Sequence, residues 1–171
     1  MQTVTEEQET RYAELQLMAL EAARQGDVET LQPLLAAGIP INLQDQKGNS
    51  LLMLASYHGH REAVVLLLNH GADPDRRNDR GQTPLGGVAF KGYLEIARLL
   101  VDHGAEPSAD QGGGQTPVMF AAVFGRKKMV AYLQGTTAKR GANAFLLKLV
   151  TNLASGVRRI VARPIPQTTG S

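Results

Sequence analysis

The sequence has 171 residues, 43% of them hydrophobic, which is enough to bury the core of about one domain. It contains no cysteine, which excludes a disulfide framework, a thiolate zinc site and a cysteine nucleophile. Residues 1–110 hold all 16 acidic residues and nine basic ones, whereas residues 111–171 hold the other nine basic residues and no acidic one. This division favours an anionic partner near the C-terminus or, more simply, a basic end that complements an acidic body.

The first residues, MQTVTEEQETRYAEL, lack the basic and apolar segments of a signal peptide. No apolar run reaches the roughly 18 residues that are needed to span a membrane. Together with the absence of cysteine, these features predict a cytoplasmic protein.

A helix is expected at the N-terminus. Residues 5–8, Thr-Glu-Glu-Gln, have the pattern of a capping box, with glutamates in the first turn, where the helix dipole favours negative charge. We assign residues 1–16 to an N-terminal capping helix that runs into the following segment and shields its outer face.

The segment that follows repeats with a period of 33 residues. Because several residue types recur in one register, we place four units, over residues 17–49, 50–82, 83–115 and 116–141. The recurring residues are Gly26, Gly59, Gly92 and Gly125; Gly38, Gly71 and Gly104; Leu34, Leu67, Leu100 and Leu133; and Ala22, Ala55, Val88 and Ala121.

Each unit predicts two short helices and a loop. Ser50, Thr83 and Thr116 are N-cap residue types, and proline follows the two threonines at the first helical position. A periodic glycine then ends the first helix in a left-handed conformation, and a second apolar helix ends at another glycine. Since neither helix can bury its apolar face alone, we predict an all-α solenoid of four stacked helix-turn-helix units with loop fingers.

Two stretches, GNSLLMLASYHGHREAVVLLLNHGADPD and GQTPLGGVAFKGYLEIARLLVDHGAEPS, resemble ankyrin repeats, whose pattern runs G-x-T-P-L-H-x-A-A-x-x-G and later L-L-x-x-G-A-D. The resemblance extends over about residues 15–134. It implies a scaffold that binds other macromolecules and rarely catalyses a reaction. The substitution of methionine for the histidine makes the chain more similar to small bacterial ankyrin proteins than to eukaryotic ones.

The chain departs from the family pattern in three ways. The histidine of T-P-L-H is replaced in every copy, so its hydrogen bonds between neighbouring loops are expected to be missing; the replacements are Leu20, Met53, Gly86 and Met119. In the fourth unit the closing glycine comes four residues late, at Gly141, which leaves the end of its second helix open. Gly87 is expected to make room for the ring of Phe120, the alternative being that the third unit is simply a weak repeat.

In ankyrin repeats, the two residues before the helix-ending glycine face a concave groove where partners dock, and the loop fingers supply further contacts. Transferred to this sequence, the resemblance implies an aromatic strip flanked by cations. Aromatic residues and arginine are enriched at interface hot spots, whereas the alternative is that the rings pack on their own helices. The candidate partner-binding residues are Tyr57, His58, Arg77, Asp79, Arg80, Phe90, Lys91, Val123 and Phe124.

No cofactor, metal ion or small-molecule substrate is expected. His58 and His60 lack a third ligand at suitable spacing, and His70 and His103 precede periodic glycines, where a structural role is expected. The glycines at 112–114 lack the lysine of a phosphate-binding loop. The sequence therefore predicts a non-enzymatic protein–protein interaction module with an unidentified protein partner.

Residues 142–163 predict an amphipathic helix, ended by Pro164, and residues 164–171 a disordered tail. This helix either caps the fourth unit or, through residues 144–163, lies on an anionic membrane surface, which would make the chain a peripheral membrane adaptor. An acidic protein is a further option, and nucleic acid is disfavoured because no stacking aromatics alternate with the basic residues. The polar stripe comprises Lys148, Asn152, Ser155, Arg159 and Arg163, and the apolar face Phe145, Leu149, Val150, Leu153, Val157 and Ile160.

Overall fold

The computed structural model describes the backbone of residues 5–161 and the side chains of residues 5–145. Within these residues the chain forms eight helices and no strand, and it divides into two compact units, Met1–Gln134 and Gly135–Ser171. The helices are α1 (Glu6–Gln25), α2 (Val28–Ala36), α3 (Leu51–His58), α4 (Arg61–Asn69), α5 (Pro84–Lys91), α6 (Leu94–Asp102), α7 (Pro117–Val123) and α8 (Lys127–Val161).

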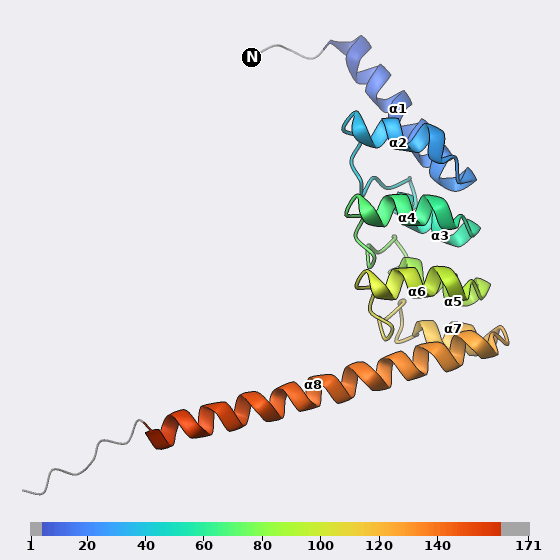
Figure 1. The fold of residues 1–171 in the computed structure, drawn as a ribbon. Coiled ribbons are helices and arrows are strands. Elements are labelled where there is room, and N and C mark those ends of the chain that lie inside the picture. Colours follow the sequence, from blue (N-terminus) through green and yellow to red (C-terminus); the bar gives the residue numbers. More distant parts are fainter. Residues whose placement is uncertain (1–4, 162–171) are drawn as a thin grey trace, which may run out of the picture. The chain divides into compact units, whose positions relative to one another are not determined.

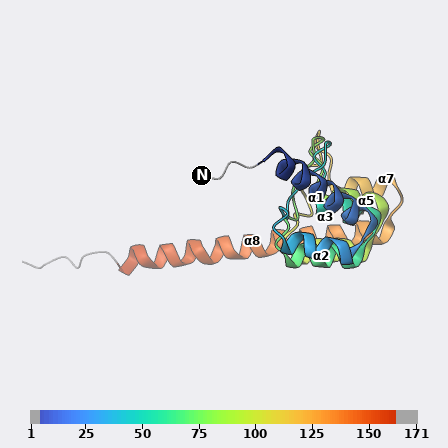
Figure 2. The same ribbon diagram turned by 90° about the horizontal axis from the view of Figure 1, so that it is seen from above.

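The helices of the first unit stack in two rows. In one row α1 packs on α3, α3 on α5 and α5 on α7, and in the other α2 packs on α4 and α4 on α6 (Figure 1). Viewed along the stack, successive helices of a row overlie one another (Figure 2). The predicted all-α solenoid is therefore confirmed. We number the helix pairs in chain order, from the first (α1 and α2) to the fourth (α7 and α8).

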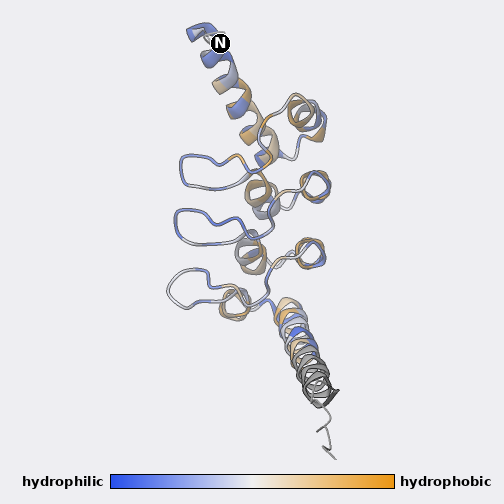
Figure 3. Ribbon diagram, turned by 90° about the vertical axis from the view of Figure 1, so that its left-hand side faces the viewer, coloured by the Kyte–Doolittle hydropathy of each residue, from blue (hydrophilic) through white to orange (hydrophobic). Residues whose placement is uncertain are grey.

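Three loops connect the helix pairs and project to one side of the stack as fingers (Figure 3). They comprise residues 37–50, 70–83 and 103–116. The apolar core lies between the two rows of helices, where leucines of one 33-residue column meet: Leu34, Leu67, Leu100 and Leu133 are all buried.

The predicted N-caps are confirmed. The side chains of Thr5, Ser50, Thr83 and Thr116 each accept a hydrogen bond from the backbone N–H three residues later, which satisfies a donor that the helix leaves free. Thr5 and Gln8 form a complete capping box. Because α1 continues without interruption from Glu6 to Gln25, residue 16 falls inside a helix, and residues 1–4 lie outside the described part.

The glycines that end the first helices meet two requirements. Gly26, Gly59 and Gly92 adopt left-handed φ values of 74°, 84° and 84°, as the sequence predicts. Each also lies beneath a side chain of the following pair: a Cβ on Gly26 would stand 2.5 Å from Cγ of His60, and one on Gly92 would stand 2.8 Å from Cδ of Arg126. Another residue in these columns would therefore be strained and would also collide with its neighbour.

The fourth pair does not end where the sequence suggested. Helix α8 runs through Gly135 and Gly141, so there is no helix end near residue 141 and no break before the amphipathic helix expected over residues 142–163. The reason is that each glycine costs only about 1 kcal/mol in a helix, while alanine, lysine and arginine around them favour it. The side chains of the expected apolar face beyond Phe145, residues 162–163 and the expected tail at 164–171 lie outside the described residues.

The pairing expected between Gly87 and Phe120 is wrong. A Cβ on Gly87 would meet only Tyr57 of the preceding pair, at 3.2 Å from Cδ2. The tighter site is Gly86, where a Cβ would lie 2.0 Å from Oε1 of Gln111. The third finger therefore reaches back over Gly86, and this contact requires a residue without a side chain.

Gln111 also replaces the absent histidine of the T-P-L-H pattern. Its Oε1 accepts from the backbone N–H of Thr83 at 2.8 Å, and its Nε2 donates to the carbonyl of Ala109 at 3.0 Å. In the two preceding fingers the equivalent residues are Asp45 and Asn78, whose side-chain oxygens accept from backbone N–H groups of their own loops. In the third finger Asp110 takes that local role, and Gln111 is available to bind Thr83.

Candidate partner-binding surface

Three aromatic rings from successive helix pairs form what we call the aromatic strip: Tyr57, Phe90 and Phe124. Tyr57 and Phe90 lie in the last turns of α3 and α5, and Phe124 is the C-cap of α7. The rings of Tyr57 and Phe90 are parallel within 2°, with centroids 6.4 Å apart, and the ring of Phe124 meets Phe90 edge-on at 4.4 Å. These separations fall in the range of favourable aromatic pairs, so the three side chains form one continuous surface.

The strip is accessible to a partner. The exposed fraction of Tyr57 is 39% and that of Phe124 is 48%, whereas Phe90 between them is half-buried. Val123, beside Phe124, is 77% exposed. The rings therefore do not only pack on their own helices.

One cation contacts the strip directly. Nζ of Lys91 lies 4.5 Å from the ring centroid of Tyr57 and 5.9 Å from that of Phe90, which is cation–π geometry. None of the ion pairs among the described residues involves Lys91, so its charge is not neutralised by a neighbouring carboxylate. The middle of the strip thus combines apolar rings with one positive charge.

His58 flanks the strip but tends to stay neutral. Its ring meets Tyr57 edge-on at 5.6 Å. Burial lowers the pKa of His58 below its usual range, and the neighbouring His60, Arg24 and Lys91 lower this pKa further, outweighing Glu21. At neutral pH the imidazole therefore adds a polar but uncharged group to the surface.

The backbone beneath the strip is fixed by the next helix pair. Nε of Arg126 donates to the carbonyl of Phe90 at 3.1 Å, and His60 makes the equivalent bond to the carbonyl of Arg24 at 3.0 Å through Nε2. Because a carbonyl only accepts, Nε2 of His60 carries the proton. These links were missed at the level of sequence, although the residues follow periodic glycines at a spacing that is a multiple of 33.

The predicted finger residues do not join the strip. Of the three cations expected to flank it, Lys91 alone contacts its rings among the described residues. The fingers lead into the N-terminal ends of α3 and α5, whereas Tyr57 and Phe90 lie at the C-terminal ends, and an eight-residue helix is about 12 Å long. Arg77 and Arg80 thus lie on the second finger, and neither makes a cation–π contact with these rings among the described residues.

Arg77 instead connects two fingers. Its Nη1 donates to the carbonyl of Gly81 at 2.6 Å and also to the carbonyl of Asp110 on the next finger. Arg80 and Asp79 are exposed, and the backbone N–H of Asp79 donates to the carbonyl of Lys47 at 3.1 Å. Arg77 thus has a structural function, and the other two form a separate polar area.

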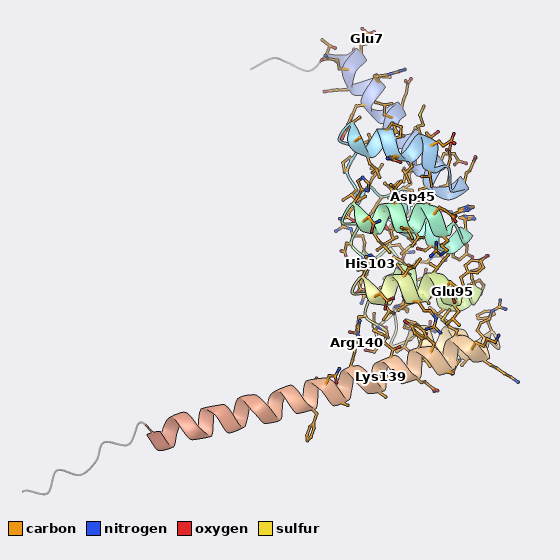
Figure 4. All side chains as sticks on the ribbon, viewed as in Figure 1. Glu7, Asp45, Glu95, His103, Lys139 and Arg140 are labelled. Carbon is orange, nitrogen blue, oxygen red and sulfur yellow. The ribbon has the colours of Figure 1, made fainter. Side chains whose placement is uncertain are left out.

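Hydrogen bonds between the fingers, expected to be missing with the histidine, are present through other groups. Nε2 of Gln44 donates to the carbonyl of Arg77 at 3.0 Å, and Asn78 donates to the side chain of Asn49 at 3.0 Å. Asp45, which accepts hydrogen bonds within the first finger, is labelled in Figure 4. Burial alone would raise the pKa of Asp45, but hydrogen bonds from Asn49 and Lys47 outweigh it and lower the pKa. The fingers are therefore tied to one another by polar contacts.

The remaining histidines have structural partners. Nδ1 of His70 and of His103 donates to the carbonyl four residues earlier, at 2.8 Å in both cases, which caps α4 and α6. Among the described residues no three His, Cys, Asp or Glu side chains are grouped as a metal ion would need. None of the helices in that same part of the chain is long and apolar enough to cross a membrane.

Stacked helix pairs that carry projecting fingers and a strip of exposed rings define a helical-repeat scaffold. The family model described as ankyrin repeats (3 copies) matches residues 19–111. The chain belongs to the ankyrin repeat family. Members of this family generally act as protein–protein interaction modules and typically are not enzymes. The fourth helix pair lies outside the matched residues.

A bacterial relative agrees with this assignment. A segment of 44 residues is 59% identical to an ankyrin repeat protein of Pseudomonas aeruginosa, PA3287. The matched segment covers 26% of this chain and 26% of that relative, so the chain spans about a quarter of the length of the curated protein it matches. The similarity therefore concerns the repeats.

Proposed function

We propose that this chain is a non-enzymatic binding module whose protein partner docks on the aromatic strip, with Lys91, His58 and Val123 at its edges. The observation that supports this most strongly is the continuity of three rings from three helix pairs, at 6.4 and 4.4 Å, on an accessible surface. Hydrogen bonds from Arg126 to the carbonyl of Phe90 and from His60 to the carbonyl of Arg24 hold the backbone at these helix ends in place. A surface that is ordered before binding costs little conformational entropy when a partner docks.

The exposed finger residues Asp79 and Arg80 provide a second, polar contact area in this proposal, and Arg77 supports it by holding neighbouring fingers together. The unpaired charge of Lys91 favours a partner segment with an apolar anchor beside acidic residues. No small-molecule substrate or cofactor enters this function. A cytoplasmic location remains part of the proposal, and cell fractionation tests it.

Affinity capture from a native lysate tests the proposed function. The chain is used as wild type, as Phe124→Ala and as Tyr12→Ala, a matched control because Tyr12 on α1 is 45% exposed and lies outside the strip. A partner that is retained by wild type and Tyr12→Ala but lost by Phe124→Ala supports docking on the strip. Equal retention by all three proteins would contradict it.

The alternative is a peripheral membrane adaptor. The basic composition of residues 111–171 and the amphipathic pattern of residues 144–163 support it. Sedimentation with anionic and with neutral vesicles separates the two functions, since the adaptor alone binds anionic lipid in a way that salt weakens. Binding that is independent of lipid charge, or absent, would exclude the adaptor.

A further inference from the structure

The last helix of the first row, α7, has an apolar face that no described side chain covers. Met119 is 51% exposed, Val123 is 77% exposed and Ala122 is also exposed. The residues 33 positions before Met119 and Ala122 are Gly86 and Ala89, and both are buried. The sequence of α7 thus provides the apolar face of an internal repeat at a position where no further repeat follows within the first unit.

At the opposite end of the stack, the first helix of the row, α1, also has exposed apolar side chains. Along α1, Glu14, Leu17, Met18 and Glu21 follow the spacing of one helix face. Leu17 is 65% exposed and Met18 is 50% exposed, whereas the equivalent residues of the next pair, 33 positions later, are 1% and 0% exposed. The face of α1 that would contact a preceding repeat is therefore open.

The charges of the two ends are opposite. The α1 face carries the carboxylates of Glu14 and Glu21, and residues 111–171 contain no acidic residue. At position 128 the fourth pair carries lysine where the first three pairs carry glutamate, and Arg126 and Lys127 precede it. An acidic occupant therefore complements this end. The chain's own residues 142–163 are basic and would place like charges together.

We propose that the α7 face of one copy binds the α1 face of a second copy, so that the chain associates head to tail. The contact repeats the internal arrangement in which each helix of this row packs on the next. Because the two surfaces differ, the association does not close after two copies and continues into a ring or a filament. This inference shares Val123 with the edge of the aromatic strip but rests on Met119 and Ala122, and it does not depend on the three rings.

Sedimentation equilibrium of the full chain tests the proposal. The weight-average mass should rise with protein concentration beyond that of a dimer, and the rise should diminish with salt as charge screening increases. A mass that stays at the monomer value at every concentration would contradict the proposal, as would an association that stops at a dimer.

Two variants make the test specific. Met119→Glu places a carboxylate on the α7 face, and its fold should be preserved because Thr116 and a glutamate three residues later form a capping box. Met18→Lys places a cation on the α1 face. Each variant alone should associate at least about tenfold more weakly than wild type, because like charges then meet.

A mixture of the two variants distinguishes head-to-tail contact from other modes. Met119→Glu retains an intact α1 face and Met18→Lys an intact α7 face, and the introduced carboxylate of one variant can meet the introduced ammonium of the other, so the mixture should recover the association that each variant alone has lost. A mixture that stays monomeric would overturn the proposal. So would a monomeric wild type whose thermal stability falls in Met119→Glu, since that result indicates that residues of the same chain cover the face.

Discussion

The third and fourth helix pairs share local sequence and differ in what surrounds them. Both begin at a threonine N-cap followed by proline, and both follow the same 33-residue register. Yet Ala89 of the third pair is fully buried, whereas its equivalent in the fourth, Ala122, is exposed. Local rules therefore determine where a helix starts, and the following neighbour determines what its residues contribute to stability.

The third pair is also joined to its finger, and the fourth is not. In the third pair, Gln111 of the finger covers Gly86 and accepts a hydrogen bond from the backbone N–H of Thr83. Met119, the residue of the fourth pair that is equivalent to Gly86, is 51% exposed. An apolar residue at the fourth pair is thus available for contact with another molecule, whereas the same position in the third pair serves the fold. Substitutions at matched positions test this difference.

The largest effect is expected for leucine in place of the matched alanines. Ala89→Leu inserts a side chain into a filled seam and should lower the free energy of unfolding by about 3 kcal/mol. Ala122→Leu, on the exposed face, should change it by less than about 0.5 kcal/mol. Urea unfolding at low protein concentration measures both. Equal losses would show that the fourth pair is covered as well as the third.

A smaller loss is expected at the two glycines of α5. Gly86→Ala displaces the side-chain amide of Gln111 from its hydrogen bonds and should cost about 2 kcal/mol. Gly87→Ala is the matched control, because only Tyr57 lies near it and alanine favours the helix, so it should stay within about 1 kcal/mol of wild type. If the two variants melted at the same temperature, the role of Gln111 would be refuted.

A gain of stability is expected from Ser56→Ala. Ser56 is fully buried, and its hydroxyl has no hydrogen-bond partner among the residues that the structure describes, although alanine occupies the same column in the other pairs. Removing this group should raise the free energy of unfolding by about 1 kcal/mol. The reverse change in the next pair, Ala89→Ser, should lower it by a similar amount. Thermal melts of both proteins check the prediction, and a destabilised Ser56→Ala would contradict it.

The smallest effect concerns the acidic contact between the second and third fingers. Burial raises the pKa of Asp75, and Asp73 and Glu106 raise it further, despite the hydrogen bond from the backbone of Glu106. A raised pKa means that the folded protein binds a proton more readily than the unfolded chain, so stability falls as the pH rises through that pKa.

Asp75→Asn should therefore be more stable than wild type at neutral pH, because its side-chain oxygen still accepts from Glu106 without the charge. The advantage should shrink as the pH falls from neutral through the raised pKa of Asp75, because the wild-type carboxyl is then protonated and uncharged. Urea unfolding over this pH range measures the difference. An advantage that is independent of pH would rule out the charge as its cause.

The architecture could be predicted from the sequence because the same residue pattern recurs in successive helix pairs. N-caps at Ser50, Thr83 and Thr116, glycine C-caps and the order of helices all followed from local chemistry in one register. The closeness of the aromatic rings also followed, since residues one or more periods apart meet in a stack.

Contacts that depend on the length and direction of side chains could not be predicted in this way. The register shows that residue 111 lies near residue 83, but it does not show that glutamine reaches over Gly86 while the side-chain oxygen of Asn78 in the preceding finger accepts from its own loop. In the same way, arginine is a residue type that is enriched at hot spots, yet the guanidinium of Arg77 donates hydrogen bonds to carbonyls of two fingers. Whether α8 continues through its two glycines depends on a balance of small helix propensities, which no local sequence signal determines.

Docking of a partner on the aromatic strip is the central claim, and site-specific photo-cross-linking tests it most directly. A benzophenone amino acid is placed at position 124 in one protein and at position 12 in another, and each is irradiated in the native lysate. Docking on the strip predicts a covalent adduct with a second kind of protein from position 124 and none from position 12. An adduct that forms equally from both positions, or only from position 12, would contradict it.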